Sequence, residues 1–198
     1  MNDRDIRAAL KAELTRRYKK DNNTLVLDEL GIKHGASRID MVVVNHRLHG
    51  YEIKSDRDSL RRLPDQIKAY SSIMDRMTLV VGYRHAYEAL RMVPEWWGVR
   101  LAEMKQQSGT VILSDARRAR DNPEVDLNAV VALLWRDEAL KILEEIGEAK
   151  GVRSKTRTDI YKRLVEVSKP DYLRARVRQQ MKSREVWRAG AQRMSCGD

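Results

Sequence analysis

Cysteine is almost absent from this chain of 198 residues, and its single example, Cys196, lies close to the end. One cysteine can form neither an intramolecular disulfide nor a multi-cysteine zinc site, so a reducing cytoplasm is the expected setting. The histidines do not show the i, i+4 spacing of a zinc-binding helix, which argues against a histidine zinc site. They are His34, His46, His49 and His85.

Long apolar runs are missing as well. The longest candidates, Met41–Val44 and Ala129–Trp135, are far shorter than the ~18 to 20 apolar residues that a membrane helix needs. The first residues, Met1 to Asp5, are not followed by the apolar stretch of a secretory signal. We therefore expect a soluble, cytoplasmic protein without a membrane partner.

Acidic residues are the minority: 29 Asp and Glu face 39 Lys and Arg, which gives a net charge of +10. The excess is uneven, because residues 151–198 carry roughly +8 and residues 1–150 only roughly +2. A basic segment on a nearly neutral body favours a polyanionic partner, nucleic acid first and an acidic membrane second. The alternative is a solvated basic surface that serves solubility.

Hydrophobic periodicity predicts an α/β protein with a central mixed sheet flanked by helices. Three- and four-residue spacing predicts a helix over residues 5–18 and another that begins near Pro64. A further polar helix is expected to end at Pro94. Strands are expected at residues 24–30, 38–44, 48–55, 77–82, 97–104 and 110–113.

The chain is expected to divide into an α/β domain, residues 1–120, and a helical basic region, residues 121–198. Helices are predicted there over residues 127–146, 158–167 and 170–181. The run from Lys155 to Leu164 resembles the second half of a SAP-type helix–loop–helix, a small DNA-binding module. Five basic side chains would contact phosphates, although a solvated basic helix fits as well. They are Arg153, Lys155, Arg157, Lys162 and Arg163.

One constellation carries candidate chemistry. Glu52 and Lys54 lie two residues apart on a predicted strand and so share a face. Acid-x-Lys triplets also occur at Glu103 and Glu148, so the triplet alone proves nothing. Asp40, however, lies on the preceding strand of a predicted hairpin, where two carboxylates can converge on Mg²⁺ or Mn²⁺. The alternative is a set of surface charges with one ion pair of little energetic value.

The helix after this hairpin adds two polar side chains. Gln66 and Tyr70 lie four residues apart, on one face, and can line the mouth of such a site. Three segments, residues 38–40, 50–55 and 66–70, together resemble the PD-(D/E)XK nuclease superfamily, and the resemblance covers roughly residues 5–82. Its Gln-x-x-x-Tyr pattern looks like that of exonuclease-type branches, and the chain looks most like small bacterial and phage proteins. Ile39, instead of the proline of the name, precedes Asp40.

This resemblance implies a restriction-endonuclease-like core with the order αβββαβ. It implies that Lys54 is the catalytic lysine, with Gln66 and Tyr70 in the catalytic site. A glutamate from the first helix, for which Glu13 is the candidate, would complete the site, and Glu29 competes for that role. The implied metal ligands are Asp40, Glu52, Ile53 and Glu13.

The preferred interpretation is a nuclease that hydrolyses DNA phosphodiesters with a Mg²⁺-activated water, without a small-molecule cofactor. The alternative is a catalytically silent DNA-binding or regulatory protein of the same fold. A third reading is a protein-interaction module whose basic tail binds an acidic partner. DNA is the expected partner, and a homodimer is an open option.

Overall fold

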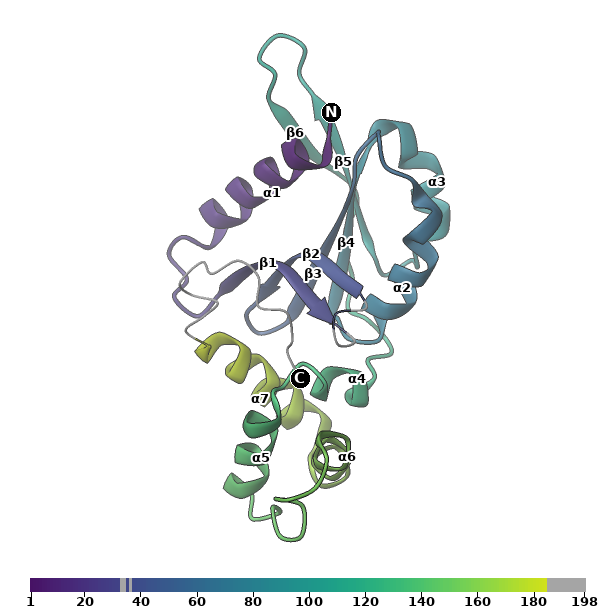
Figure 1. The fold of residues 1–198 in the computed structure, drawn as a ribbon. Helices are drawn as coiled ribbons and strands as arrows, with labels where there is room; N and C mark the ends of the chain where they lie inside the picture. Colours follow the sequence, from purple (N-terminus) through teal and green to yellow (C-terminus); the bar gives the residue numbers. More distant parts are fainter. Residues whose placement is uncertain (33–34, 36, 185–198) are drawn as a thin grey trace.

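The structure, a computed structural model, describes residues 1–32, 35 and 37–184, and its centre is a six-stranded sheet with the strands in sequence order (Figure 1). Strands β1, β2 and β3 pair antiparallel, β3, β4 and β5 pair parallel, and β6 returns antiparallel to β5. The mixed sheet predicted from the sequence is therefore confirmed. The strands are β1 (Leu25–Ile32), β2 (Ser37–Val44), β3 (Leu48–Lys54), β4 (Arg76–Gly82), β5 (Gly98–Met104) and β6 (Val111–Arg117).

Helices cover both faces of the sheet. On one face lies α1 (Asp3–Tyr18), which begins at a capping box between Asn2 and Asp5 and buries Ile6, Leu10 and Leu14 against the sheet. On the other face lie α2 (Leu63–Ser71) and α3 (Ala86–Met92) (Figure 1). Short 3-10 turns, η2 (Leu60–Arg62) and η3 (Tyr83–His85), lead into these two helices.

Alternation along β3 gives its two faces different chemistry. Tyr51 and Ile53 pack with the apolar residues of α1, while Glu52 and Lys54 point to the face that α2 covers. Because β3, β4 and β5 are parallel, their carboxyl ends Lys54, Gly82 and Met104 lie along one edge of the sheet.

Four helices follow the sheet, namely α4 (Leu127–Val131), α5 (Arg136–Glu145), α6 (Arg157–Val167) and α7 (Pro170–Ser183). The single helix expected over residues 127–146 is wrong, because α4 ends at Val131 and α5 starts at Arg136. The Glu138 carboxylate accepts the Trp135 backbone N–H at 2.7 Å and so caps a new helix there. Leu133 and Leu134 are buried in the turn between α4 and α5, so the apolar pattern continues across the break. The sequence alone therefore predicts one continuous helix.

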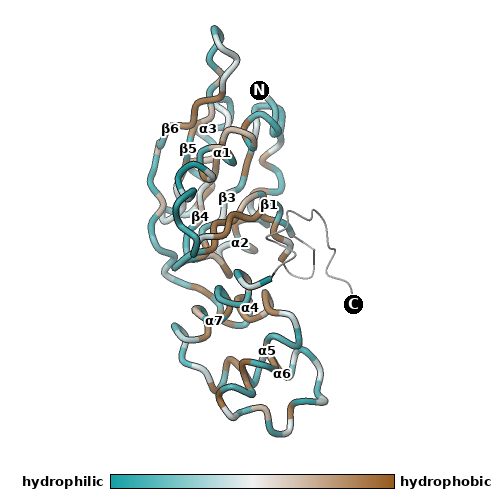
Figure 2. The backbone as a smooth tube through the Cα atoms, turned by 90° about the vertical axis from the view of Figure 1, so that its left-hand side faces the viewer, coloured by the Kyte–Doolittle hydropathy of each residue, from teal (hydrophilic) through white to brown (hydrophobic). Residues whose placement is uncertain are grey.

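The sheet and the helical region share one hydrophobic core. Val130, Leu173 and Val177 belong to the same buried cluster as Val42 and Leu79 of the sheet. Figure 2 shows hydrophobic stretches both in the sheet and in the helical region below it. The segment between them is anchored, since the Asn122 N–H donates to the Asp75 carbonyl at 2.8 Å. The division at residue 120 stays a prediction.

The predicted fold is confirmed only at the level of its class. The α/β class is confirmed, with seven α-helices in the described part of the chain, whereas the restriction-endonuclease-like arrangement stays a prediction. Among the described residues, no helix has the length and apolar character needed to span a membrane.

Candidate functional site

A gap between two strands organises the candidate site. The β2–β3 ladder is regular from Val44–Leu48 to Met41–Tyr51 and then stops. At the next position the Asp40 carboxylate accepts the Ile53 backbone N–H, with Oδ2 at 2.8 Å from the nitrogen. A side chain thus replaces the carbonyl that would continue the ladder, and the two strands part at this point.

The first helix supplies the second partner of Asp40. The Arg7 guanidinium donates to Asp40 Oδ1 at 2.6 Å and to the Asp40 carbonyl at 3.0 Å. It also reaches Asp3 one turn earlier on α1, at 3.3 Å. Both carboxylate oxygens of Asp40 are therefore engaged, one by a backbone amide and one by a cation.

Glu52 and Lys54 form a buried ion pair, with 2% and 5% of their surfaces exposed. Lys54 Nζ lies 2.6 Å from Glu52 Oε1, and Gln66 Nε2 donates to the same oxygen at 2.5 Å. The second carboxylate oxygen of Glu52 is buried and has no hydrogen-bond partner among the described residues. A buried acceptor without a partner costs free energy, so this oxygen is the open position of the site.

Tyr70 holds the outer part of the cluster. Its hydroxyl donates to the Arg38 carbonyl at 2.6 Å and accepts from Gln66 Nε2 at 3.1 Å. Because α2 presents Gln66 and Tyr70 one turn apart, the amide is held against Glu52 from one side and against the tyrosine from the other.

Burial and charge shift the protonation equilibrium of Glu52. Burial, followed by the nearby negative charge of Asp40, raises the pKa of Glu52 to about 7, although Lys54 acts in the opposite direction. The carboxyl group therefore changes charge near neutral pH. Burial, followed by the charge of Glu52, also raises the pKa of Tyr70, which keeps its hydroxyl protonated as a donor.

The structure brings together Asp40, Glu52, Lys54, Gln66 and Tyr70, but it places the proposed third carboxylate elsewhere. Glu13 accepts two hydrogen bonds from Arg100 of β5, at 3.1 and 2.9 Å. Its competitor Glu29 pairs with Arg38 at 3.3 Å, at a position of β1 with φ of 57°. Neither glutamate contacts Asp40 or Glu52 in the described structure.

Sequence reasoning missed Arg7, whose guanidinium joins the cluster from α1. The only sequence signal is its i, i+4 spacing from Asp3, which points to a local ion pair and not to a contact with β2. Within the described residues, no group of three or more His, Cys, Asp or Glu side chains is arranged to hold a metal ion.

The five basic residues predicted to contact DNA differ in their surroundings. Arg153 lies 3.2 Å from Glu144, and Arg163 pairs with Glu148, so both are partly neutralised. Lys155 and Lys162 are exposed and make no ion pair in the described structure, and Arg157 begins α6. Cys196 lies outside the described residues.

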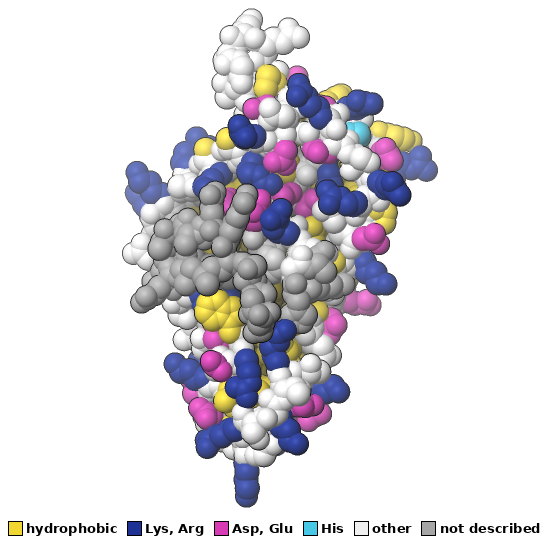
Figure 3. Space-filling view, in the orientation of Figure 1, with side chains coloured by type: hydrophobic (Ala, Val, Ile, Leu, Met, Phe, Trp, Pro, Cys, Tyr) yellow, Lys and Arg dark blue, Asp and Glu magenta, His cyan; other side chains and the backbone are white. Residues whose placement is uncertain are grey.

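Exposed lysines extend the basic character of the helical region. Residues 127–183 hold 13 basic and 8 acidic side chains, and Figure 3 shows Lys and Arg spread over this lower part of the molecule. Five exposed lysines have no ion pair within the described part of the chain. They are Lys141, Lys150, Lys155, Lys162 and Lys169.

The fold and its charges define a mixed α/β protein that continues into a basic helical region. The chain belongs to the family of bacteriophage P4 protein cII, whose model matches residues 1–197. Protein cII of Enterobacteria phage P4 is 26% identical over 132 residues, which make up 66% of this chain and 49% of that protein. The match thus spans about half the length of this relative. No solved structure matches the chain.

This family match corrects the resemblance drawn from the sequence motifs. Assignment to the PD-(D/E)XK superfamily is wrong, because the match over nearly the whole chain is to the phage protein cII family. The motifs that suggested the superfamily are three short segments, and acid-x-Lys triplets recur by chance in so charged a chain. The side chains around Glu52 do lie together in the structure, but their arrangement does not define the family.

Proposed function

We propose that this member of the protein cII family is a DNA-binding protein that acts by occupying DNA, in a regulatory role without turnover. The observation that carries the proposal is the set of five exposed lysines of the helical region that form no ion pair with the residues the structure describes. Cations that are free of protein partners can replace the counterions of phosphates, and this release gives sequence-independent affinity for DNA.

The state of the Asp40–Glu52 cluster supports binding without turnover. Its two carboxylates already face two internal cations, Arg7 and Lys54, at 2.6 Å each. Within this arrangement the charged groups hold α1, β2, β3 and α2 together, which is a structural role.

The proposal is tested by the affinity of the full chain for duplex DNA over a range of salt concentrations. We compare Lys150→Gln/Lys155→Gln/Lys162→Gln with the matched variant Lys19→Gln/Lys20→Gln/Lys105→Gln, which removes the same charge from exposed sites of the α/β region. The first variant should bind more weakly, and its salt slope should fall by up to about 0.9 per lost phosphate contact. Equal slopes in the two variants would contradict the proposal.

The second candidate function is metal-dependent hydrolysis of a phosphodiester bond. It is favoured by the buried, unpartnered second oxygen of Glu52. With Asp40 and the Ile53 carbonyl, this oxygen would hold a Mg²⁺ ion, because Mg²⁺ needs only one or two carboxylates and keeps several waters. Asp40 could contribute fully only after Arg7 leaves its Oδ1.

In this second reading the metal would supply charge stabilisation at phosphorus. Gln66 would orient Glu52, and the Lys54 ammonium would hold a phosphate oxygen. Incubation of supercoiled and linear DNA with the purified protein and Mg²⁺, Mn²⁺ or EDTA decides between the candidates. Metal-dependent cleavage that Glu52→Gln abolishes would establish hydrolysis, while DNA binding without cleavage supports the first proposal.

A further inference from the structure

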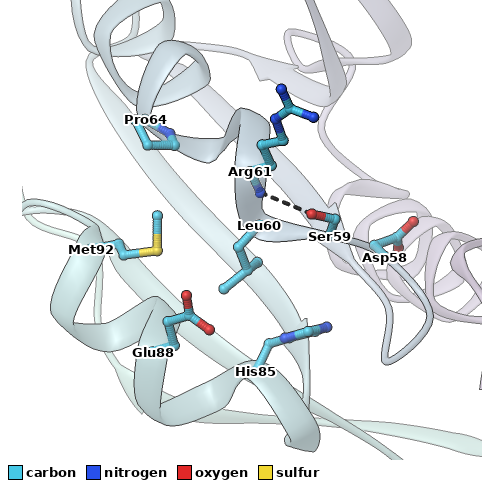
Figure 4. Close-up of a pocket in the computed structure, with 8 residues that line it drawn as sticks. All are labelled: Asp58, Ser59, Leu60, Arg61, Pro64, His85, Glu88 and Met92. Atoms are coloured by element: carbon cyan, nitrogen blue, oxygen red, sulfur yellow. Dashed lines mark hydrogen bonds between the residues drawn. The ribbon is translucent and has the colours of Figure 1, made fainter.

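A cleft of about 410 Å³ lies between the start of α2 and helix α3 (Figure 4). Its volume falls within the ~300 to 1,000 Å³ of typical small-molecule sites. Leu60, Pro64 and Met92 form its apolar part, and Glu88 and His85 of the α3 side add polar atoms. The Nε2 atom of the lining residue His85 is itself buried and has no hydrogen-bond partner among the described residues, so an unsatisfied polar atom belongs to the wall of the cleft.

Two exposed tyrosines lie immediately before and within α3, the helix that forms one side of the cleft. Tyr83 and Tyr87 expose 71% and 75% of their surfaces, the largest values among the exposed large hydrophobic residues of the described chain. The Arg91 guanidinium lies 5.6 Å from the centre of the Tyr87 ring and donates to its hydroxyl at 3.3 Å. The Tyr87 ring therefore already contacts a cation, whereas the Tyr83 ring is open to solvent.

Close packing at the end of β4 fixes where these tyrosines emerge. Asp56 Oδ1 accepts the Arg84 N–H at 3.1 Å, and a Cβ at Gly82 would lie 2.3 Å from the same oxygen. Glycine is therefore required at this position. The loop after β3 and the turn after β4 meet at the carboxyl edge of the parallel strands, where open α/β sheets bind ligands.

One arginine, Arg61, lines the cleft, and Arg57, Arg62 and Arg84 lie next to lining residues in the chain. Four exposed arginine side chains form no ion pair within the described residues. The nearby carboxylates of Asp56 and Asp58 accept backbone N–H groups, from Arg84 and from Ser55 at 2.6 Å. Together with Asp65 and Glu88, these two carboxylates offset the formal charge of the four arginines, so stacking is expected to contribute more than charge. The four arginines are Arg57, Arg61, Arg62 and Arg84.

We infer that this surface, the cleft together with Tyr83, Tyr87 and the four arginines, binds single-stranded nucleic acid. Neighbouring bases stack on the two tyrosine rings, an unpaired base enters the cleft, and the arginines contact the phosphates. A duplex cannot use the surface in this way, because its bases are stacked on one another and present only their edges. The inference rests on the proposed DNA-binding function and adds the strandedness of the substrate to it.

The test measures binding of the full chain to single-stranded and duplex oligonucleotides of mixed sequence. Tyr83→Ala/Tyr87→Ala is expected to lower the affinity for single-stranded DNA at least about tenfold and to leave duplex affinity unchanged. The salt slope should stay the same, because no cation is removed. Tyr83→Phe/Tyr87→Phe keeps both rings and should restore binding, and Tyr172→Ala on α7 is the control for loss of an exposed tyrosine.

Failure of the proposed function and failure of the single-strand inference give different results. If the wild-type chain binds neither form of DNA, the proposed function fails. If it binds duplex DNA while the alanine double variant keeps its single-strand affinity, only this inference is overturned, and the tyrosines are left to a protein partner. An equal loss of affinity for both forms would also overturn it.

Discussion

Arg7 of α1 and Asp40 of β2 are joined by two hydrogen bonds, one to a carboxylate oxygen and one to the carbonyl of the same residue. The contact fixes the first helix at the point where β2 and β3 separate. On the other side of the gap, Asp40 holds the Ile53 N–H, so one aspartate links α1, β2 and β3. Removal of the guanidinium should therefore loosen three elements at once.

Arg7→Ala is expected to lower the free energy of unfolding by about 1.5 to 3 kcal/mol, the range for hydrogen bonds to a charged group. Urea-induced unfolding followed by circular dichroism measures the change. Arg4→Ala is the matched control, because Arg4 lies in the same helix, is exposed and has no partner among the described residues. Its effect should stay within about 0.5 kcal/mol. Similar losses in both variants would show that the Arg7–Asp40 contact does not stabilise the fold.

The raised pKa of Glu52 predicts a pH-dependent difference between the wild type and Glu52→Gln. Between its ordinary value of 4.5 and about 7, the folded chain keeps a proton that the unfolded chain has released. Wild-type stability therefore falls as pH rises through this window, by at most about 1.4 kcal/mol per pH unit from this group. Glutamine does not titrate and lacks this loss.

The stability of Glu52→Gln relative to the wild type should accordingly increase from about pH 5 to about pH 7. Urea midpoints of both proteins at several pH values in this range give the difference directly, and shifts shared by other groups cancel. A difference that stays constant with pH, or that changes in the opposite direction, would contradict the raised pKa.

Much of the site followed from local patterns in the sequence. The hairpin placed Asp40 opposite Glu52, strand alternation placed Lys54 on the face of Glu52, and helical spacing paired Gln66 with Tyr70. The role of Arg7 could not be predicted, because periodicity identifies the apolar face of α1 but not the polar group that crosses its edge. Glu13 does not join the cluster for a related reason, since it lies about 9 Å farther along the axis of α1 than Arg7 does.

The fold shows the same limit at α4 and α5. The apolar residues from Leu127 to Ile146 favour one helix, but buried leucines also fill the turn that separates the two. Asp137 and Glu138, in the first turn of α5, were an available start signal, since acids favour helix N-termini. A tertiary requirement, the burial of Leu133 and Leu134, outweighed helix propensity.

The hydroxyl of Tyr70 offers a test of the polar cluster that leaves its charges unchanged. Tyr70→Phe removes the donor to the Arg38 carbonyl and one partner of Gln66. A loss of about 1 to 3 kcal/mol is expected in urea unfolding, because the part-buried Arg38 carbonyl loses its donor. Tyr87→Phe, at an exposed tyrosine whose hydroxyl contacts only Arg91 in the described structure, should be nearly neutral. Equal effects would show that the buried hydroxyl adds nothing.

Burial should decide the value of two aspartates that otherwise have similar partners. Asp75 is 4% exposed, accepts the Leu48 N–H at 2.6 Å and pairs with Arg174 and Arg178 of α7. Asp121 also pairs with two arginines, Arg47 and Arg76, but its side chain is 56% exposed.

Asp75→Asn is expected to destabilise the chain by about 3 to 5 kcal/mol, because it leaves the α7 arginines without their buried counter-charge. Asp121→Asn should cost at most about 1 kcal/mol, since solvent screens exposed pairs. Urea unfolding of both variants, with and without about 0.5 M added salt, measures the contrast, and salt should affect the wild-type-to-variant difference mainly for Asp121. Because Asp75, directly before β4, pairs with arginines of α7, its loss should also separate the unfolding of the helical region from that of the sheet. A single coincident transition with a small loss would show instead that the shared apolar core alone holds the two regions together.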